Sequence, residues 1–263
     1  MEFLYAIVLG FIEGVTEFLP ISSTGHLILA NQWIGFSEDF NTTFDIAIQS
    51  GAILAVVVVY WKKLWPFANG VLDRSVLNTW MKILVAVVPA LVLGALFGSV
   101  VRDVLFTPMI VALALIVGGI ALIVVEWRRH SEHVKSIDRM TYATAFMIGL
   151  VQCIALIPGT SRSAATIIGA LLLGVARPAA AEFSFFLAIP TLGAATVFAI
   201  MQDGAVIEPS QINLLVLGAF AAFLSAYLVI RKFIQFIQKK DFLPFAYYRI
   251  ALGLIMLVIF VAR

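Results

Sequence analysis

Long apolar stretches separated by short polar segments dominate the pattern of the chain. A helix that spans the hydrocarbon core of a bilayer needs about 20 predominantly apolar residues, and six stretches come close to that length. They cover approximately residues 44–61, 83–101, 109–125, 184–201, 212–230 and 246–262. The pattern therefore predicts an all-α integral membrane protein with six transmembrane helices.

Two further apolar stretches, residues 3–30 and 143–173, are broken by proline, hydroxyl and charged residues. The breaks fall at Pro20 and Pro158, and a proline inside a helix removes a backbone hydrogen bond and kinks or ends the helix. Irregular backbone at membrane depth is tolerated where it lines a cavity enclosed by protein. We therefore expect two re-entrant broken helical segments, each of which enters and leaves the membrane on one side.

The basic residues are distributed unevenly over this topology. Arg102 and Arg263 fall on the side of the termini, and Arg162 and Arg249 fall at membrane depth, where Arg249 is interpreted as a side chain that extends from a helix end to the interface. The other side receives thirteen basic residues, at positions 62, 63, 74, 82, 128, 129, 135, 139, 177, 231, 232, 239 and 240. Cytoplasmic loops are enriched in Lys and Arg, so both termini are predicted outside. Two full spans in place of the re-entrant segments would satisfy this rule less well at Arg177.

The order of elements is repeated, because a broken segment followed by three spans occurs twice. An odd number of crossings in each half inverts the second half relative to the first, and such repeats place their site at the midplane between the halves. The matching positions are Gly10, Glu13, Pro20, Gly35 and Phe44 in one half and Gly149, Gln152, Pro158, Gly174 and Phe183 in the other. We therefore expect a single membrane domain, residues 1–263, with inverted repeat halves of approximately residues 1–128 and 140–263.

Composition agrees with a membrane protein and excludes other classes. Hydrophobic residues make up 62% of the chain and charged residues 12%, about half the charged fraction of an ordinary soluble domain. The net charge is only +2 and the basic residues fall in short tracts, so a nucleic-acid partner is not expected. The lone cysteine, Cys153, has no second thiol to pair with and is interpreted as a packing residue.

The first broken segment carries two carboxylates, Glu13 and Glu17, which are four residues apart and so project from the same helical face. Two ionised carboxylates at membrane depth need a metal ion, an arginine or a histidinium, unless one of them holds a proton. A protonated pair at the interface is the structural alternative. Because ionisable residues inside membrane segments mark functional sites by default, we favour a functional pair.

Hydroxyl side chains follow the break at Pro20. Ser22, Ser23 and Thr24 stand where a second helix begins, and hydroxyls and free backbone N–H groups at a helix N-terminus bind anions. Simple helix capping explains the same triplet. His26 is either a proton donor or an interfacial histidine.

The second broken segment repeats the arrangement with Thr160, Ser161, Arg162 and Ser163 after its proline. The planar guanidinium of Arg162 suits phosphate oxygens. A structural ion pair with one of the two glutamates is the alternative. The two segments together predict a phosphate-handling site between the halves.

The two motifs resemble those of the bacitracin-resistance family of undecaprenyl-diphosphate phosphatases. The resemblance rests on residues 13–26 and on Pro158 to Ser163, in the family's order, and covers essentially the whole chain. One departure is Ala164, where the family has a glycine after its final serine.

The resemblance implies a hydrolase that converts undecaprenyl diphosphate to undecaprenyl phosphate in the bacterial inner membrane. Such an enzyme recycles the lipid carrier for cell-wall synthesis and confers resistance to bacitracin. The resemblance also implies dependence on a divalent cation, Mg²⁺ or Ca²⁺, and a cleft that opens to the outer face. The oligomeric state is left open, a homo-oligomer included.

Carried over residue by residue, the family's motifs assign roles to this chain. Glu13 and Glu17 become metal ligands, and the catalytic set consists of Glu17, Ser23, His26 and Arg162. The phosphate-binding set consists of Ser22, Thr24, Thr160, Ser161, Arg162 and Ser163. We assign Ser23 as the nucleophile with Glu17 as its base, while attack by His26 or by water fits the same residues.

A transporter or flippase of an anionic lipid phosphate fits the inverted repeat equally well. The clustering of nucleophile, acid–base and metal candidates favours hydrolysis, because a transporter needs only binding groups. The other large class of membrane phosphatases requires a further histidine after its Ser-Arg motif, and no histidine follows His133 in this chain.

Overall fold

The computed structural model describes residues 1–68, 71–128, 132–203, 208–209 and 211–261. The regular structure of the described part is helical, apart from a β-hairpin with two residues in each strand and one isolated bridge between Val134 and Val175. In the hairpin, β1 (Phe67–Ala68) pairs antiparallel with β2 (Val71–Leu72). The predicted all-α class is confirmed.

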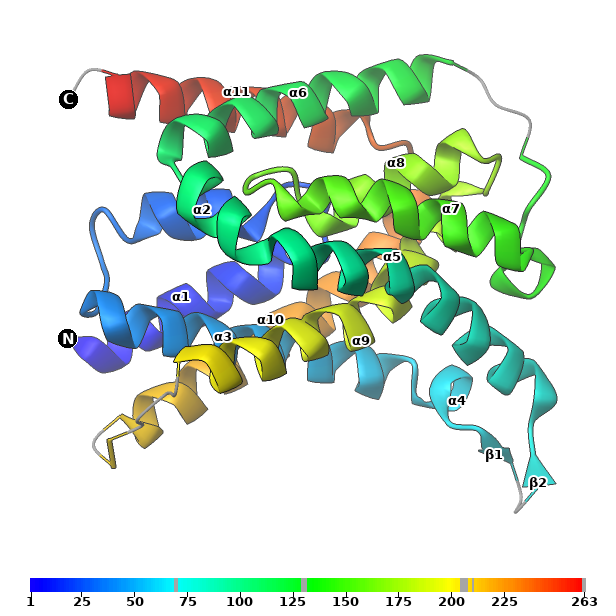
Figure 1. The fold of residues 1–263 in the computed structure, drawn as a ribbon, viewed down its shortest axis with the longest axis horizontal. Coiled ribbons are helices and arrows are strands. Elements are labelled where there is room, and N and C mark those ends of the chain that lie inside the picture. Colours follow the sequence, from blue (N-terminus) through cyan, green and yellow to red (C-terminus); the bar gives the residue numbers. More distant parts are fainter. Residues whose placement is uncertain (69–70, 129–131, 204–207, 210, 262–263) are drawn as a thin grey trace.

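The helices form a bundle in which most axes run along the long dimension of the molecule (Figure 1). In chain order they are α1 (Glu2–Thr16), α2 (Ser23–Ala30), α3 (Glu38–Val59), α4 (Trp61–Leu64), α5 (Arg74–Leu105), α6 (Pro108–Trp127), η1 (Ile137–Arg139), α7 (Tyr142–Gln152), η2 (Cys153–Leu156), α8 (Arg162–Leu172), α9 (Arg177–Asp203), α10 (Ile212–Ile237) and α11 (Leu243–Val261).

Four of the six predicted spans lie within one long helix each, while the span 44–61 extends two residues beyond α3 and the span 246–262 extends one residue beyond α11. In the described part of the chain, five helices have stretches long and apolar enough to cross a membrane: α5, α6, α9, α10 and α11. The sixth predicted span coincides with α3, whose apolar part Thr43–Val59 is shorter. The chain is therefore a multi-pass membrane protein.

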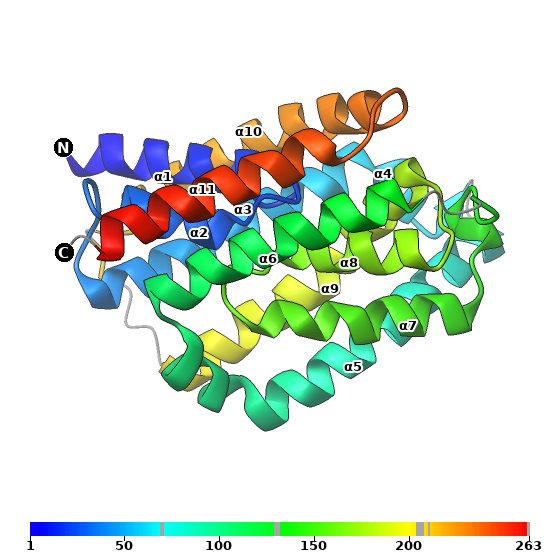
Figure 2. The same cartoon turned by 90° about the horizontal axis from the view of Figure 1, so that it is seen from above.

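The two broken segments form two helical hairpins. The chain runs through α1, turns at residues 17–22 and returns through α2, and it runs through α7 and η2, turns at residues 157–161 and returns through α8. Figures 1 and 2 show that the first hairpin starts from the end of the molecule that holds the N-terminus and the second from the opposite end. The predicted breaks are confirmed, and the two turns meet in the interior.

Glycines let the hairpins approach their neighbours closely. A Cβ atom added at Gly10 would lie 2.2 Å from the Gly218 carbonyl oxygen of α10, and one added at Gly149 would lie 2.1 Å from the Ala86 carbonyl oxygen of α5. Helix pairs in membranes pack through small residues in this way. The first segment of each hairpin is thereby fixed against a long helix of the other half.

The end of the molecule opposite both termini holds α4, the end of α6 and the start of α9, and basic residues form ion pairs there (Figure 1). Lys63 of α4 forms an ion pair with Glu182 of α9, and Arg177 at the start of α9 pairs with Glu126 at the end of α6. The basic positions 129 and 263 lie outside the described residues, as does the side chain at position 102.

Candidate functional site

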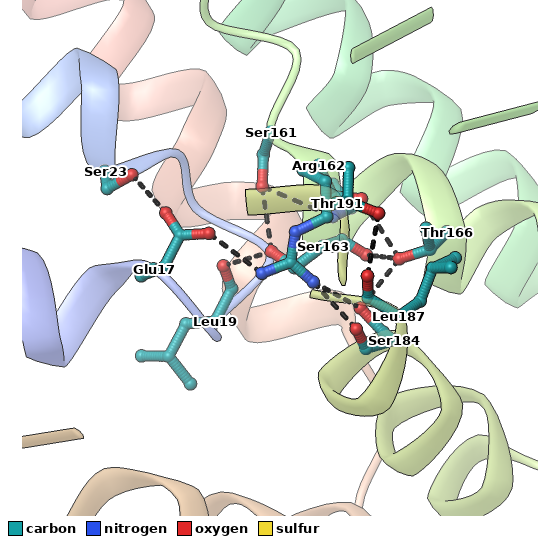
Figure 3. Close-up of polar contacts among 11 residues, drawn as sticks. Glu17, Leu19, Ser23, Ser161, Arg162, Ser163, Thr166, Ser184, Leu187 and Thr191 are labelled. Carbon is teal, nitrogen blue, oxygen red and sulfur yellow. Dashed lines mark hydrogen bonds and ion pairs between the residues drawn. The ribbon is translucent and has the colours of Figure 1, made fainter. Parts of the chain in front are cut away.

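A chain of polar contacts joins the two hairpin turns, and Glu17 stands at its centre. Glu17 ends α1, with its carboxylate 7% exposed. Ser23 Oγ, in the first turn of α2, donates to Glu17 Oε2 at 2.7 Å. Arg162 Nη2, at the start of α8, donates to Glu17 Oε1 at 2.8 Å. Figure 3 shows the carboxylate between the hydroxyl and the guanidinium.

Arg162 is held on its other side by α9. Its Nη1 donates to the Ser184 carbonyl oxygen at 2.8 Å and to Ser184 Oγ at 3.3 Å, and Thr166 Oγ1 donates to the same Ser184 hydroxyl at 2.7 Å. The guanidinium also lies over the Phe18 ring, 5.8 Å from its centroid. Among the described residues, the buried Arg162 Nε has no hydrogen-bond partner, so one N–H of the fork remains for a ligand.

Serines of the second hairpin bind the backbone of the first. Ser163 Oγ donates to the Leu19 carbonyl oxygen at 2.8 Å. Because the single proton of Ser163 is used in this way, Ser161 Oγ must be the donor in the 2.9 Å contact between the two hydroxyls. Figure 3 shows both serines beside Arg162. The relative position of the turns is therefore fixed by more than one ion pair.

Both hairpin turns contain a serine in a backbone conformation that favours glycine. Ser22 and Ser161 each have φ 70°, cap the following helix, and accept from the backbone N–H three residues later. A non-glycine residue with positive φ costs on the order of 1 kcal/mol or more and is found most often at functional sites. The separation of Ser22 and Ser161 along the chain equals that of Gly10 and Gly149. The two turns thus have the same backbone conformation at equivalent positions of the two halves.

The remaining predicted residues lie around this centre. Glu13 is buried in α1, one turn before Glu17. Thr24 lies in the first turn of α2, while the Thr160 carbonyl oxygen accepts from Arg249. His26 lies on α2 and bonds Tyr248 of α11, with 2.7 Å between Nε2 and the phenol oxygen. His26 thus belongs to a contact pair of its own beside the centre.

The interpretation of Arg249 as a side chain that extends to the interface is wrong. Arg249 is fully buried, although it lies in the first half of α11, close to the polar segment that precedes this helix. Its guanidinium donates to carbonyl oxygens of both turns and of α6, namely those of Pro20, Gly159, Thr160, Ala114 and Leu115. Proline and glycine breaks leave carbonyls without helical partners, and this arginine satisfies them.

We expect Arg249→Leu to destabilise the protein by roughly 3 kcal/mol or more, because several buried carbonyl groups lose a charged donor. The midpoint of thermal unfolding in detergent measures the loss. Arg231→Leu is the matched control, since Arg231 is an exposed arginine on α10 that donates to the Tyr227 hydroxyl. Equal midpoints for the two variants would contradict a structural role for Arg249.

Two carboxylates are available for a metal ion. Within the described ranges no group of three or more His, Cys, Asp or Glu side chains is placed to hold one. Glu17 already accepts from Ser23 and Arg162, which leaves Glu13 as the second acidic side chain of the segment. Mg²⁺ is commonly bound through one or two carboxylates together with substrate phosphates and water. The donor set fits a cation that binds together with a diphosphate.

A family match and three relatives place the chain among known proteins. Residues 6–255 match the model of the family described as "Bacitracin resistance protein BacA". The chain is 48% identical over 249 residues to the undecaprenyl-diphosphatase of Sphingopyxis alaskensis, with 94% of each protein covered. It is 48% identical over 260 residues to that of Herminiimonas arsenicoxydans, with 97% of the chain and 94% of the relative covered. It is 46% identical over 257 residues to that of a Polaromonas species, with 96% and 93% covered.

Proposed function

The chain belongs to the bacitracin resistance protein BacA family, and on that premise we propose that it removes the terminal phosphate of undecaprenyl diphosphate at the centre formed by Glu17, Ser23 and Arg162. The product, undecaprenyl phosphate, returns to cell-wall synthesis as a lipid carrier. Removal of the diphosphate form of the carrier is the basis of the bacitracin resistance in the family's description.

One observation carries the proposal. The proton of Ser23 points at a carboxylate whose other oxygen is held by an arginine. A nucleophile within hydrogen-bond reach of a base, with the base oriented by a third group, is the general signature of covalent catalysis. A group that only bound an anion would leave the hydroxyl proton free to donate to the anion.

The steps follow from these positions. Ser23 Oγ attacks the terminal phosphorus while Glu17 Oε2 accepts the hydroxyl proton. The bond from that phosphorus to the bridging oxygen breaks, and undecaprenyl phosphate leaves with the bonding electron pair. Water then attacks the phosphorus of the phosphoserine and gives a proton to His26. The bond from phosphorus to Ser23 Oγ breaks, Oγ takes back the proton held by Glu17, and inorganic phosphate leaves. Arg162 offsets the negative charge on the phosphoryl oxygens throughout, which is the main contribution of protein to phosphoryl transfer.

His26 acts on the leaving or the attacking oxygen in this scheme. It stands on the first turns of α2, three residues after Ser23. An imidazole at that place can protonate the leaving phosphate oxygen or activate the water of the second step.

A divalent cation, Mg²⁺ or Ca²⁺, is proposed to bind with the substrate. Glu13, with Glu17 beside it, would hold the ion, and the diphosphate would complete its oxygen ligands. When bound, such an ion neutralises phosphate charge and polarises the phosphorus–oxygen bond.

The protein is proposed to reside in the bacterial inner membrane as one domain of two inverted halves with both termini outside. Two observations support this arrangement. Lys63 of α4 and Arg177 at the start of α9 lie toward the end opposite the termini, in agreement with the positive-inside rule. The two hairpins enter from opposite ends and share the conformation of Ser22 and Ser161.

Release of inorganic phosphate from undecaprenyl diphosphate by detergent-purified protein tests the proposal. We expect activity that requires Mg²⁺ or Ca²⁺ and that falls at least about a hundredfold in Glu17→Gln, since the base is lost. Glu182→Gln, which removes a carboxylate whose ion pair is with Lys63 of α4, should retain full activity. If the folded wild type releases no phosphate, hydrolysis is overturned, and transport of a lipid phosphate becomes the favoured function.

A further inference from the structure

His26 and Tyr248 form a contact pair beside the proposed reaction centre. The two rings are parallel within 5°, with centroids 5.5 Å apart, and His26 Nε2 lies 2.7 Å from the Tyr248 hydroxyl oxygen. The other ring nitrogen, Nδ1, lies 2.7 Å from the Ser22 carbonyl oxygen. Both nitrogens of the imidazole are therefore bound, one to the first hairpin and one to α11.

These two contacts fix where the protons are. A carbonyl oxygen only accepts, so Nδ1 carries a proton and donates to Ser22. In the neutral imidazole Nε2 is then unprotonated and accepts from the Tyr248 hydroxyl. In the imidazolium Nε2 donates to the phenol oxygen instead. The phenol serves either protonation state, whereas a group that only donates or only accepts would favour one of them.

The residues next to this pair in the chain belong to the proposed reaction centre. Ser22 has a positive φ and caps the N-terminus of α2, and Ser23 follows it directly. The bond of His26 to the Ser22 carbonyl oxygen therefore anchors the imidazole to the backbone that carries the nucleophile. Tyr248 directly precedes Arg249, which binds the carbonyl oxygens of both turns. One stretch of α11 thus holds the turns and the histidine together.

We propose that Tyr248 is a positioning residue for the phosphatase reaction, which acts by holding His26 with Nε2 as the nitrogen that exchanges a proton with the substrate or with water. This inference rests on the proposed function. The phenol is 45% exposed, so it can withdraw when a phosphate oxygen replaces it at Nε2. Tyr248 itself takes no part in bond making or breaking.

The variant Tyr248→Phe removes the hydroxyl and keeps the ring that stacks on His26. We expect kcat to fall about tenfold, which corresponds to the loss of one neutral hydrogen bond, with KM changed less than about twofold. Tyr247→Phe is the matched control, because Tyr247 is the neighbouring and similarly exposed tyrosine of α11. It should keep the kcat of the wild type.

A double-mutant cycle separates positioning from general stability. If Tyr248 acts through His26, Tyr248→Phe has no further effect in a His26→Ala background, whereas a structural role would cost the same factor in both backgrounds. In protein labelled with ¹⁵N-histidine, the Nε2 resonance of His26, identified by its absence in His26→Ala, should move in Tyr248→Phe and stay in Tyr247→Phe.

The outcomes distinguish the inference from the proposed function. A wild type that releases phosphate together with a Tyr248→Phe variant of unchanged kcat, or an equal loss in both backgrounds, overturns the role of Tyr248 alone. An unmoved Nε2 resonance overturns the contact itself. A wild type without phosphate release overturns the proposed function, and the inference falls with it.

Discussion

Ser23→Ala is expected to lower phosphate release at least about ten-thousand-fold, the scale on which removal of an attacking group acts in enzymes that form a covalent intermediate. The hydroxyl lies 2.7 Å from the Glu17 carboxylate, while the second hairpin is also tied to the first by the bond of Ser163 to Leu19. The fold should therefore survive the change. Single-turnover release of phosphate, together with the midpoint of thermal unfolding, measures both expectations.

Ser50→Ala provides the control, because Ser50 is an exposed serine of α3 that bonds the carbonyl oxygen of Ile46. A Ser23→Ala variant that turns over as fast as Ser50→Ala would rule out the serine as nucleophile. His26→Ala would then separate the two remaining routes. Loss of activity there, with a phosphohistidine trapped on the wild type, would assign attack to the imidazole, and retained activity would assign it to water.

Arg162→Lys is expected to lower activity about a thousandfold, the lower end of the effect of an arginine on a transferring phosphoryl group. The positive charge is kept, but an ammonium group cannot bind Glu17 and Ser184 with two separate nitrogens and still offer a third donor to a phosphate. The main effect should fall on kcat, because charge stabilisation matters most in the transition state.

Arg231→Lys is the control for this substitution, since Arg231 is exposed and lies over the Tyr227 ring. Full activity in Arg162→Lys would indicate that the arginine only neutralises a buried carboxylate. Arg162→Ala adds a second measurement. It leaves Glu17 buried without its cation and should destabilise the protein by about 3 kcal/mol or more.

Much of the architecture could be predicted because it depends on local pattern. The apolar stretches have the length of membrane helices, and the prolines at positions 20 and 158 mark the two breaks. The charge of the first segment showed that its glutamates need a metal ion, a cation or a proton, and the ion pair of Arg162 with Glu17 is the structural alternative that the sequence left open. Each of these predictions depends only on the residues of one segment and not on contacts between segments.

The contacts that close the site depend on packing between segments far apart in the chain, and spacing within a segment does not reveal them. Arg249 lies near a polar helix end, where an arginine usually extends to water, and nothing local indicates that two broken turns offer it their carbonyls. The partner of His26 on α11 and the part played by Ser184 of α9 were missed for the same reason. A buried position for Arg249 could have been inferred from the need of interrupted backbone for donors.

The position of Arg249 in α11 has a consequence for biosynthesis. Both hairpins precede α11 in the chain and are therefore synthesised before Arg249. Until α11 is made, the carbonyl groups of the two turns lack the donor that Arg249 provides. A nascent or prematurely terminated polypeptide accordingly contains every residue of the Glu17, Ser23 and Arg162 centre without the part that locks it. The centre can therefore be locked for cleavage of the lipid only after α11 has been synthesised and has packed against both turns.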